Sequence, residues 1–118
     1  MNDSQATYFR LQAAANEIAV KVTDEIVANV DRLRKLGAKK ILVNNMPPLG
    51  CTPQSARYGN YTGCDEHGNI MASVHNNNLQ QKLANDNTVR ILDIHTAFTN
   101  IISGTSGMYT SAVIFSSL

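Results

Sequence analysis

A long helical pattern lies near the start of the chain. Between about Leu11 and Leu36, apolar residues recur at spacings of three and four, which places them on one face of an α-helix. Charged residues occupy the opposite face, so this helix is predicted to cover an apolar surface with one side and to meet water with the other. Residues 1–10 are predicted to form a loop that leads into it. The apolar face consists of Ile18, Val22, Ile26, Val30, Leu33 and Leu36, with Ala15 and Ala19 beside them.

An unbroken aliphatic run follows the helix. The run Ile41–Val43 has no polar residue in alternation, which is the pattern of a strand buried on both faces. Pro47 and Pro48 come shortly after it. Because proline lacks an N–H donor and has a fixed φ angle, a strand ladder cannot continue past Met46. We therefore predict a strand over about residues 40–45.

A second helix and a second strand repeat this order. The helix is predicted from an N-cap at Asn69 to about Asn85, and the strand covers residues 89–94, which read VRILDI. A short helix is predicted over about 96–103, and beyond Gly104 the pattern dissolves. Helix, strand, helix, strand in this order predicts a parallel sheet with right-handed crossovers, which is an α/β layer fold. The inward face of the second helix is predicted to carry Val74, Leu79 and Leu83.

Composition excludes several classes of function. At 118 residues the chain forms one domain at most, and ten Lys and Arg against nine Asp and Glu give a net charge of +1. With no long run of one sign, no nucleic-acid partner and no anionic membrane surface is predicted. No apolar run approaches the roughly 18 residues of a membrane span. The first residues contain no basic segment followed by an apolar core, so no secretory signal is predicted in this chain. No specific protein partner is predicted either.

Self-contained catalytic and metal motifs are absent from the sequence. It contains no G-x-S-x-G elbow, Walker loop, G-x-G-x-x-G, H-E-x-x-H or paired C-x-x-C. His67, His75 and His95 are too widely spaced for a helical metal pair, so neither a metal nor a cofactor is predicted. Asp93 and His95 follow the second strand at the edge where open parallel sheets bind ligands. A pair at this position more often satisfies backbone or solvent groups than it catalyses.

Two cysteines bound a loop rich in Gly, Tyr, Asn and Thr. A disulfide between Cys51 and Cys64 would contribute about 3 kcal/mol by restricting the unfolded chain, and the alternative is a pair of free buried thiols. Between them, Asn60-Tyr61-Thr62 is an N-glycosylation sequon, as is Asn2-Asp3-Ser4 near the start. A chain this rich in Asn, Ser and Thr contains roughly two sequons by chance, so they are weak evidence of secretion.

The order of the motifs resembles one known family. A helix end and a strand are followed by a double-proline motif, a second cysteine, a His-Asn helix and a second strand; these segments are Gly37–Val43, Met46–Pro53, Gly63-Cys64, His75-Asn76 before Leu79 and Leu83, and Leu92–Ile94. In this order they resemble the plant GDSL esterase/lipase family, a branch of the SGNH hydrolases. The resemblance implies a secreted serine hydrolase of carboxylic esters with a three-layer α/β/α flavodoxin-like fold. It covers about residues 1–103 as a partial domain and leaves 104–118 as an irregular or non-family tail.

The resemblance also implies site residues. Met1-Asn2-Asp3 is similar to the end of the family's G-x-N-D turn, which makes Asn2 the expected oxyanion donor through an amide N–H. The loop carrying Pro47, Pro48, Leu49 and Gly50, tied by the cysteine pair, is expected to shape the pocket for a small-molecule or lipid ester. Since parallel strands share one carboxyl edge, Asn2, the 46–68 loop and Asp93 are expected on the same rim.

Three features of the family pattern are absent from this sequence. There is no GDS nucleophile block, no set of preceding strands and no Asp-x-x-His after residue 103. We therefore expect a truncated gene model or splice product, corresponding to the back half of an enzyme whose full-length members are extracellular or in the secretory pathway. Two functions remain open: ester hydrolysis by family descent, or a catalytically inactive α/β fragment that is either inert or acts by pairing with a partner through its bare strand.

Overall fold

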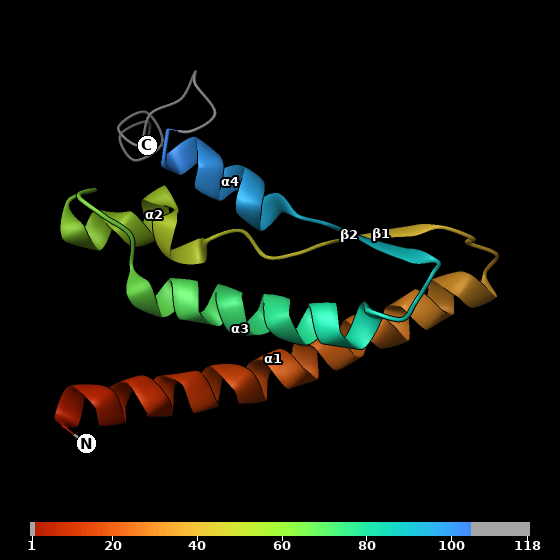
Figure 1. The fold of residues 1–118 in the computed structure, drawn as a ribbon, viewed down its shortest axis with the longest axis horizontal. Coiled ribbons are helices and arrows are strands. Elements are labelled where there is room, and N and C mark those ends of the chain that lie inside the picture. Colours follow the sequence, from red (N-terminus) through yellow and green to blue (C-terminus); the bar gives the residue numbers. More distant parts are fainter. Residues whose placement is uncertain (1, 105–118) are drawn as a thin grey trace. The chain divides into compact units, whose positions relative to one another are not determined.

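The computed structural model describes residues 2–104, in which helices and strands alternate along the chain (Figure 1). Contacts divide these residues into two units, which are described separately. The first contains the residues up to Asn45 together with Val74–Leu92, and the second contains Met46–Ser73 and the residues from Asp93 onward. The elements are α1 (Asp3–Lys35), β1 (Ile41–Asn44), η1 (Leu49–Cys51), α2 (Pro53–Ala56), η2 (Arg57–Gly59), α3 (Glu66–Leu83), β2 (Val89–Leu92) and α4 (Ile94–Ile102), where η marks a 3₁₀-helix.

The two strands of the first unit pair in parallel, as predicted. Ile41 lies opposite Val89 and Asn44 lies opposite Leu92. Both strands are shorter than predicted. The second ends at Leu92 because Asp93 becomes the N-cap of α4, where its side chain accepts a hydrogen bond from the Thr96 backbone N–H. The α/β class predicted from the order of elements is therefore confirmed.

The core of the first unit lies between the strands, α1 and the C-terminal half of α3. Its centre is Leu79, which is fully buried, and the other buried members are Val30, Ile41, Leu83 and Val89. Leu79 and Leu83 confirm the predicted inward face of the second helix, while Val74 is only half-buried. In Figure 1, α1 runs alongside α3 over this stretch. This core brings together residues of α1 and β1 with residues of α3 and β2 that lie about fifty positions later in the sequence. The two helices thus cover one face of the paired strands.

The prediction that the first strand is buried on both faces is wrong for the described chain. Ile41 is buried, but its neighbour Leu42 is 71% exposed, and Leu92 on the paired strand is 50% exposed. Successive strand residues point to opposite faces, and the core side chains of α1 and α3 meet only one of them. The uninterrupted aliphatic run predicted the strand correctly. Burial of both strand faces would need a second layer of structure on the face that carries Leu42.

Helix α1 begins eight residues earlier than predicted. Residues 1–10 were predicted to be a loop, yet the helix starts at Asp3. The cause is a capping box: the Asn2 side chain accepts a hydrogen bond from the backbone N–H of Gln5, and the Gln5 side chain accepts one from the backbone N–H of Asn2. Two of the N–H groups that a helix start leaves unpaired are thereby satisfied, which allows the helix to begin without an apolar stripe.

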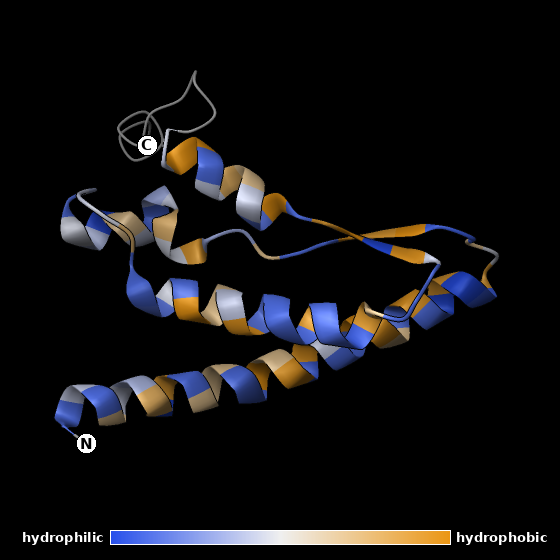
Figure 2. Cartoon of the chain, viewed as in Figure 1, coloured by the Kyte–Doolittle hydropathy of each residue, from blue (hydrophilic) through white to orange (hydrophobic). Residues whose placement is uncertain are grey.

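The buried face of α1 also differs from the predicted stripe. Its buried residues are Ala15, Ala19, Thr23 and Val30, whereas Ile18, Val22, Leu33 and Leu36 are exposed. Figure 2 shows that apolar and polar positions alternate along the whole of this helix. Lys82 of α3 donates hydrogen bonds to Thr23 Oγ1 at 2.7 Å and to the Val20 carbonyl at 3.1 Å. Polar bonds as well as apolar packing therefore join α1 to α3.

Among residues 2–104, no helix combines the length and the apolar composition needed to cross a bilayer.

Burial of His75 predicts a pH-dependent stability. His75 on α3 is 7% exposed, and the burial lowers the pKa of its imidazole below the ordinary value of 6.5. The folded chain therefore binds this proton less readily than the unfolded chain. The free energy of unfolding has its full value above pH 6.5 and falls as the pH drops from 6.5 toward the lower pKa of the folded state.

Urea unfolding at a series of pH values checks this prediction. We expect His75→Gln to show a smaller loss of stability on acidification than the unchanged chain. His67→Gln, a substitution of an exposed histidine on the same helix, is the matched control and should keep the original pH dependence. Equal pH dependence in His75→Gln and the unchanged chain would contradict the assignment.

Candidate oxyanion and loop site

Asn2 is the N-cap of α1 and forms two hydrogen bonds with Gln5. Its Oδ1 accepts from the backbone N–H of Gln5 at 2.8 Å, and its own backbone N–H donates to Gln5 Oε1 at 3.0 Å. Within residues 2–104, no hydrogen bond uses the Nδ2 group of Asn2, and the residue is exposed. The side-chain NH₂ is therefore the donor of Asn2 that is left for a ligand.

This arrangement suits a negatively charged oxygen. The unpaired N–H groups of a helix start carry a partial positive charge that favours an anion. The cap holds Oδ1 of Asn2 on the Gln5 backbone N–H. A donor held in advance in this way can stabilise charge that appears during a reaction without rearranging first. The resemblance predicts Asn2 as an oxyanion donor through an amide N–H, and this role stays a prediction.

The Pro47–Gly50 loop belongs to the second unit and is held tightly there. Pro48 and Gly50 are buried, and the backbone turns into η1 with Cys51 N–H donating to the Pro48 carbonyl at 2.9 Å. Gly50 is fixed on both sides of its peptide. Its N–H donates to Asn69 Oδ1 at 2.9 Å, and its carbonyl accepts from the Asp65 N–H at 2.7 Å.

Two glycines allow this loop to touch the start of α3. A Cβ added to Gly50 would overlap the backbone carbonyl of Asp65, and one added to Gly68 would lie 2.8 Å from the Gly50 nitrogen. Backbone meets backbone here, so no side chain fits between them. The loop is therefore clamped on α3 by geometry as well as by hydrogen bonds.

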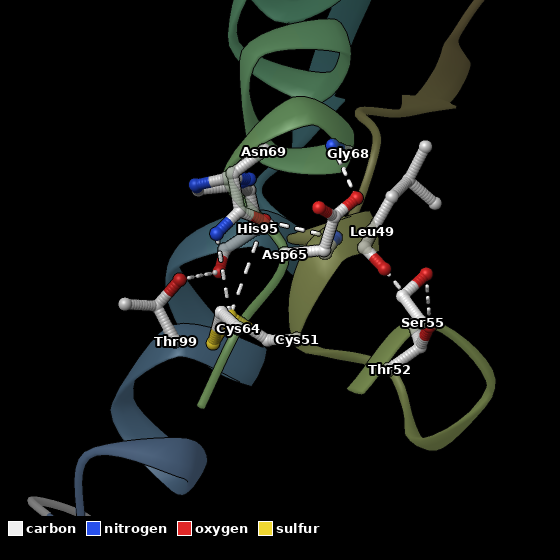
Figure 3. The surroundings of a disulfide bond; sticks show 11 residues. Leu49, Cys51, Thr52, Ser55, Cys64, Asp65, Gly68, Asn69, His95 and Thr99 are labelled. Atoms are coloured by element: carbon white, nitrogen blue, oxygen red, sulfur yellow. Dashed lines mark hydrogen bonds between the residues drawn. A yellow bond between two sulfur atoms is a disulfide. The ribbon is translucent and has the colours of Figure 1, made fainter. Parts of the chain in front are cut away.

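Asn69 is the polar centre of the contact, which corrects its predicted role. It was predicted to be the N-cap of the second helix, but α3 starts at Glu66 and ends at Leu83, so Asn69 lies inside the first turns. Figure 3 shows its side chain facing the cysteine pair, with Nδ2 3.4 Å from Cys51 Sγ. One amide thus binds both the loop backbone and the cysteine at its end.

A disulfide joins Cys51 and Cys64 across a sequence separation of 13 residues (Figure 3). Cys51 is buried and packs with Ala56 and Ile102, while Cys64 is exposed. A cross-link closing a loop of this length contributes about 3 kcal/mol by restricting the unfolded chain. The bond ties the end of the Pro47–Gly50 loop to the segment that leads into α3.

Asp93 and His95 are engaged within the fold. Asp93 caps α4 by accepting from the backbone N–H of Thr96 at 3.0 Å and from its hydroxyl at 2.7 Å. His95 Nδ1 lies 3.1 Å from the Met46 carbonyl oxygen. These contacts favour the structural interpretation of this strand-end pair over the catalytic one. Over residues 2–104, no three His, Cys, Asp or Glu side chains gather where they could hold a metal ion.

The predicted site residues fall into two groups. Asn2 lies in the first unit, whereas the Pro47–Gly50 loop and the cysteine pair lie together in the second. The shared rim expected for Asn2, the 46–68 loop and Asp93 stays a prediction. Sequence reasoning missed Gly68 and the role of Asn69. The sequence does place Gly68 next to Asn69, shortly after Cys64 and near the start of a predicted helix. A glycine at such a position can indicate a close backbone contact.

Comparison with known proteins adds the family. The GDSL-like Lipase/Acylhydrolase family matches residues 1–113. This match extends past residue 103, where the end of the family domain is predicted, and that boundary stays a prediction. The predicted irregular tail lies outside the described residues from 105 onward. No solved structure matches the chain.

Curated relatives from Arabidopsis thaliana carry the same family name. GDSL esterase/lipase At5g03610 is 37% identical over 87 residues, covering 69% of this chain and 24% of the relative. GDSL esterase/lipase At3g09930 is 30% identical over 105 residues, covering 81% of this chain and 30% of the relative. GDSL esterase/lipase At5g03600 is 28% identical over 103 residues, covering 79% and 32%. The chain thus spans between a quarter and a third of the length of these relatives.

Proposed function

The chain belongs to the GDSL-like lipase/acylhydrolase family, and on that premise we propose that it forms part of an enzyme that hydrolyses carboxylic ester bonds. The observation that carries the proposal is the capped Asn2, whose Oδ1 is held by the helix while its Nδ2 is left to donate. This is the residue that the family resemblance identifies as the oxyanion donor.

The proposed role follows from the chemistry of ester cleavage. When a nucleophile attacks the ester carbonyl, the carbonyl oxygen becomes the negative oxygen of a tetrahedral intermediate. Asn2 Nδ2–H donates to that oxygen, and the positive end of α1 favours the same charge. One such donor is worth about 3 kcal/mol of transition-state stabilisation. The family pattern places the nucleophile in a GDS block and the base in an Asp-x-x-His block, and neither pattern occurs in these 118 residues.

The disulfide-tied loop is proposed to shape the substrate pocket. Three features support this role because they hold the loop in one conformation: the burial of Pro48, the backbone contact of Gly50 and the Cys51–Cys64 bond. A wall held in advance binds a substrate at less entropic cost than a mobile loop does. The proposed substrate is a small-molecule or lipid ester. Disulfides persist in oxidising compartments, which supports an extracellular or secretory location for the whole enzyme.

A chimera tests this function. Residues 1–104, which lie within the part of this chain that matches the family, replace the corresponding family segment of the Arabidopsis relative At5g03610, and the rest of that relative is kept. Hydrolysis of a short-chain nitrophenyl ester is then measured beside the unaltered relative. We expect turnover that an organophosphate abolishes. A chimera that folds and secretes like the relative but does not hydrolyse the ester would contradict the proposal.

A second function is favoured by one observation, the apolar exposure of the strand pair. Leu42 and Leu92 are exposed on the sheet face that α1 and α3 do not cover, so a non-catalytic chain could bind a partner there. The isolated chain separates the two. We expect it to give no ester turnover by itself, and turnover that an organophosphate abolishes would reject the non-catalytic alternative.

A further inference from the structure

We propose that Asn60 is a site of N-linked glycosylation and that Asn2, in the other sequon of the chain, is not. Asn60-Tyr61-Thr62 lies between the two bonded cysteines, and all three of its residues are exposed. The proposal goes beyond ester hydrolysis and concerns a different part of the molecule. It is carried by the local conformation of the two sequons and by the disulfide that surrounds one of them.

The backbone presents Asn60 at the tip of a turn. Asn60 follows η2 and adopts a left-handed conformation with φ 54° and ψ 34°, and Tyr61 is left-handed as well, with φ 61°. Two successive left-handed residues end the short helix and turn the chain outward. Within residues 2–104, no hydrogen bond involves the Asn60 side chain. The carboxamide is therefore free to enter the active site of a transferase.

The hydroxyl of the sequon lies in the same turn. Thr62 Oγ1 donates to the Gly59 carbonyl at 2.5 Å, and the Thr62 backbone N–H donates to the same carbonyl at 3.1 Å. The Asn60 and Tyr61 backbone N–H groups donate to the Arg57 carbonyl of η2 at 3.1 Å and to the Ala56 carbonyl of α2 at 3.0 Å, so the sequon forms the turn that ends these two short helices. A glycosylation acceptor has to be at the surface, in a loop that can leave the fold locally.

The sequon at Asn2 has the opposite environment. Asp3 and Ser4 are the first residues of α1, and both Oδ1 and the backbone N–H of Asn2 are bonded to Gln5. Modification there would require the first turn of a 33-residue helix to unwind. The last two residues of the sequon at Asn2 are therefore held in helical conformation, whereas the sequon at Asn60 lies in a turn.

The disulfide supplies an independent reason. A bond between Cys51 and Cys64 forms and persists in an oxidising compartment, and the secretory pathway is also where N-glycans are attached. The sequon lies between the two bonded cysteines, so one loop contains both the disulfide and the candidate glycosylation site. Tyr58, two residues before Asn60, is 81% exposed, and a glycan on Asn60 would shield this aromatic ring from water.

The reaction is a group transfer from a lipid-linked oligosaccharide pyrophosphate. A bond forms between Asn60 Nδ2 and the anomeric carbon of the first sugar, and the bond between that carbon and the pyrophosphate oxygen breaks. Nδ2 loses one proton, and the lipid pyrophosphate departs as the leaving group. No oxidant or reductant takes part, and the transferase is supplied by the host cell.

The test uses the full chain secreted from plant cells behind a cleavable signal. The product is treated with a peptide N-glycosidase in heavy-oxygen water, which converts a glycosylated Asn to a labelled Asp, and its peptides are analysed by mass spectrometry. We expect the label at Asn60 and none at Asn2. An unlabelled Asn60 in a secreted product with its disulfide formed would overturn the proposal, as would a label at Asn2.

Matched variants separate the acceptor from folding. Asn60→Gln and Thr62→Ala should each lose the glycan completely, and Thr62→Ser should regain it because the hydroxyl is retained. Ser4→Ala, which removes the second sequon, should leave the glycan unchanged. Peptide mapping without reduction confirms that each variant keeps the Cys51–Cys64 bond. A glycan that persists in Thr62→Ala would also contradict the assignment.

Discussion

Asn2→Asp in the chimera is expected to lower kcat by about 10²–10³-fold while leaving the stability unchanged. Aspartate retains a side-chain oxygen for the Gln5 N–H, so it keeps the helix cap. It has no N–H to donate, so the hydrogen bond to the negative oxygen of the intermediate is lost. The measurement is kcat and KM on the nitrophenyl ester, together with thermal unfolding of the same preparations.

Two further substitutions show which property of Asn2 matters. Asn2→Ala should lose both functions, with a similar fall in kcat and a helix cap weakened by about 0.5–2 kcal/mol. Asn2→Ser keeps a neutral cap without the amide, so a matching loss of activity would show that the negative charge of aspartate is not the cause. Full activity in the aspartate variant would remove Asn2 from the oxyanion site.

Gly50→Ala is expected to destabilise the second unit by about 1–3 kcal/mol or more, the cost of forcing extra volume into a packed contact. The new methyl group would overlap the backbone carbonyl of Asp65 and lie 2.9 Å from Asn69 Oδ1. Neither neighbour can withdraw easily, because Asp65 and Asn69 both bond the peptide of Gly50. The loop has to leave α3, and those two hydrogen bonds are lost with it.

The matched control is Gly63→Ala in the same disulfide-closed segment, where an added Cβ meets nothing within 4 Å. This substitution should change stability little. Urea unfolding of the isolated chain measures both variants, and limited proteolysis between Cys51 and Cys64 reports whether the loop has opened. Equal stability of Gly50→Ala and Gly63→Ala would contradict the glycine contact.

The parts of the fold that sequence predicted are those set by local pattern. The aliphatic run Ile41–Val43 and the matching run at Val89 each identified a strand, and the helix between them required parallel pairing. The start of α1 was missed although its signal was present, since Asn2 and Gln5 are spaced as a capping box. The apolar stripe begins only near Leu11, so periodicity alone predicts a loop for the polar first turns.

The buried face of α1 could not be predicted because it depends on its neighbour. Ile18 and Val22 are the more apolar residues, yet Ala15 and Ala19 are buried, and apolar periodicity does not show which side of a helix another element covers. The contact between the Pro47–Gly50 loop and α3 could not be predicted from sequence either. Gly50 and Gly68 matter because their backbones meet across eighteen residues of sequence, a distance over which periodicity carries no information.

Family resemblance predicts the candidate site, and the structure adds the hydrogen bonds of its residues. The capping box engages Oδ1 and the backbone N–H of Asn2 and leaves Nδ2 as the remaining donor of this residue. The cysteine pair was one of two alternatives from sequence, and the structure joins the two residues.

The most direct test is a crystal structure of the chimera after its nucleophile has reacted with an organophosphate. The phosphoryl oxygen then occupies the position of the negative oxygen in the tetrahedral intermediate. The account predicts Asn2 Nδ2 within about 2.7–3.1 Å of that oxygen, with Oδ1 still bonded to the Gln5 N–H. A phosphoryl oxygen bound by other donors, with the Asn2 side chain turned away from it, would contradict the proposed function of this chain.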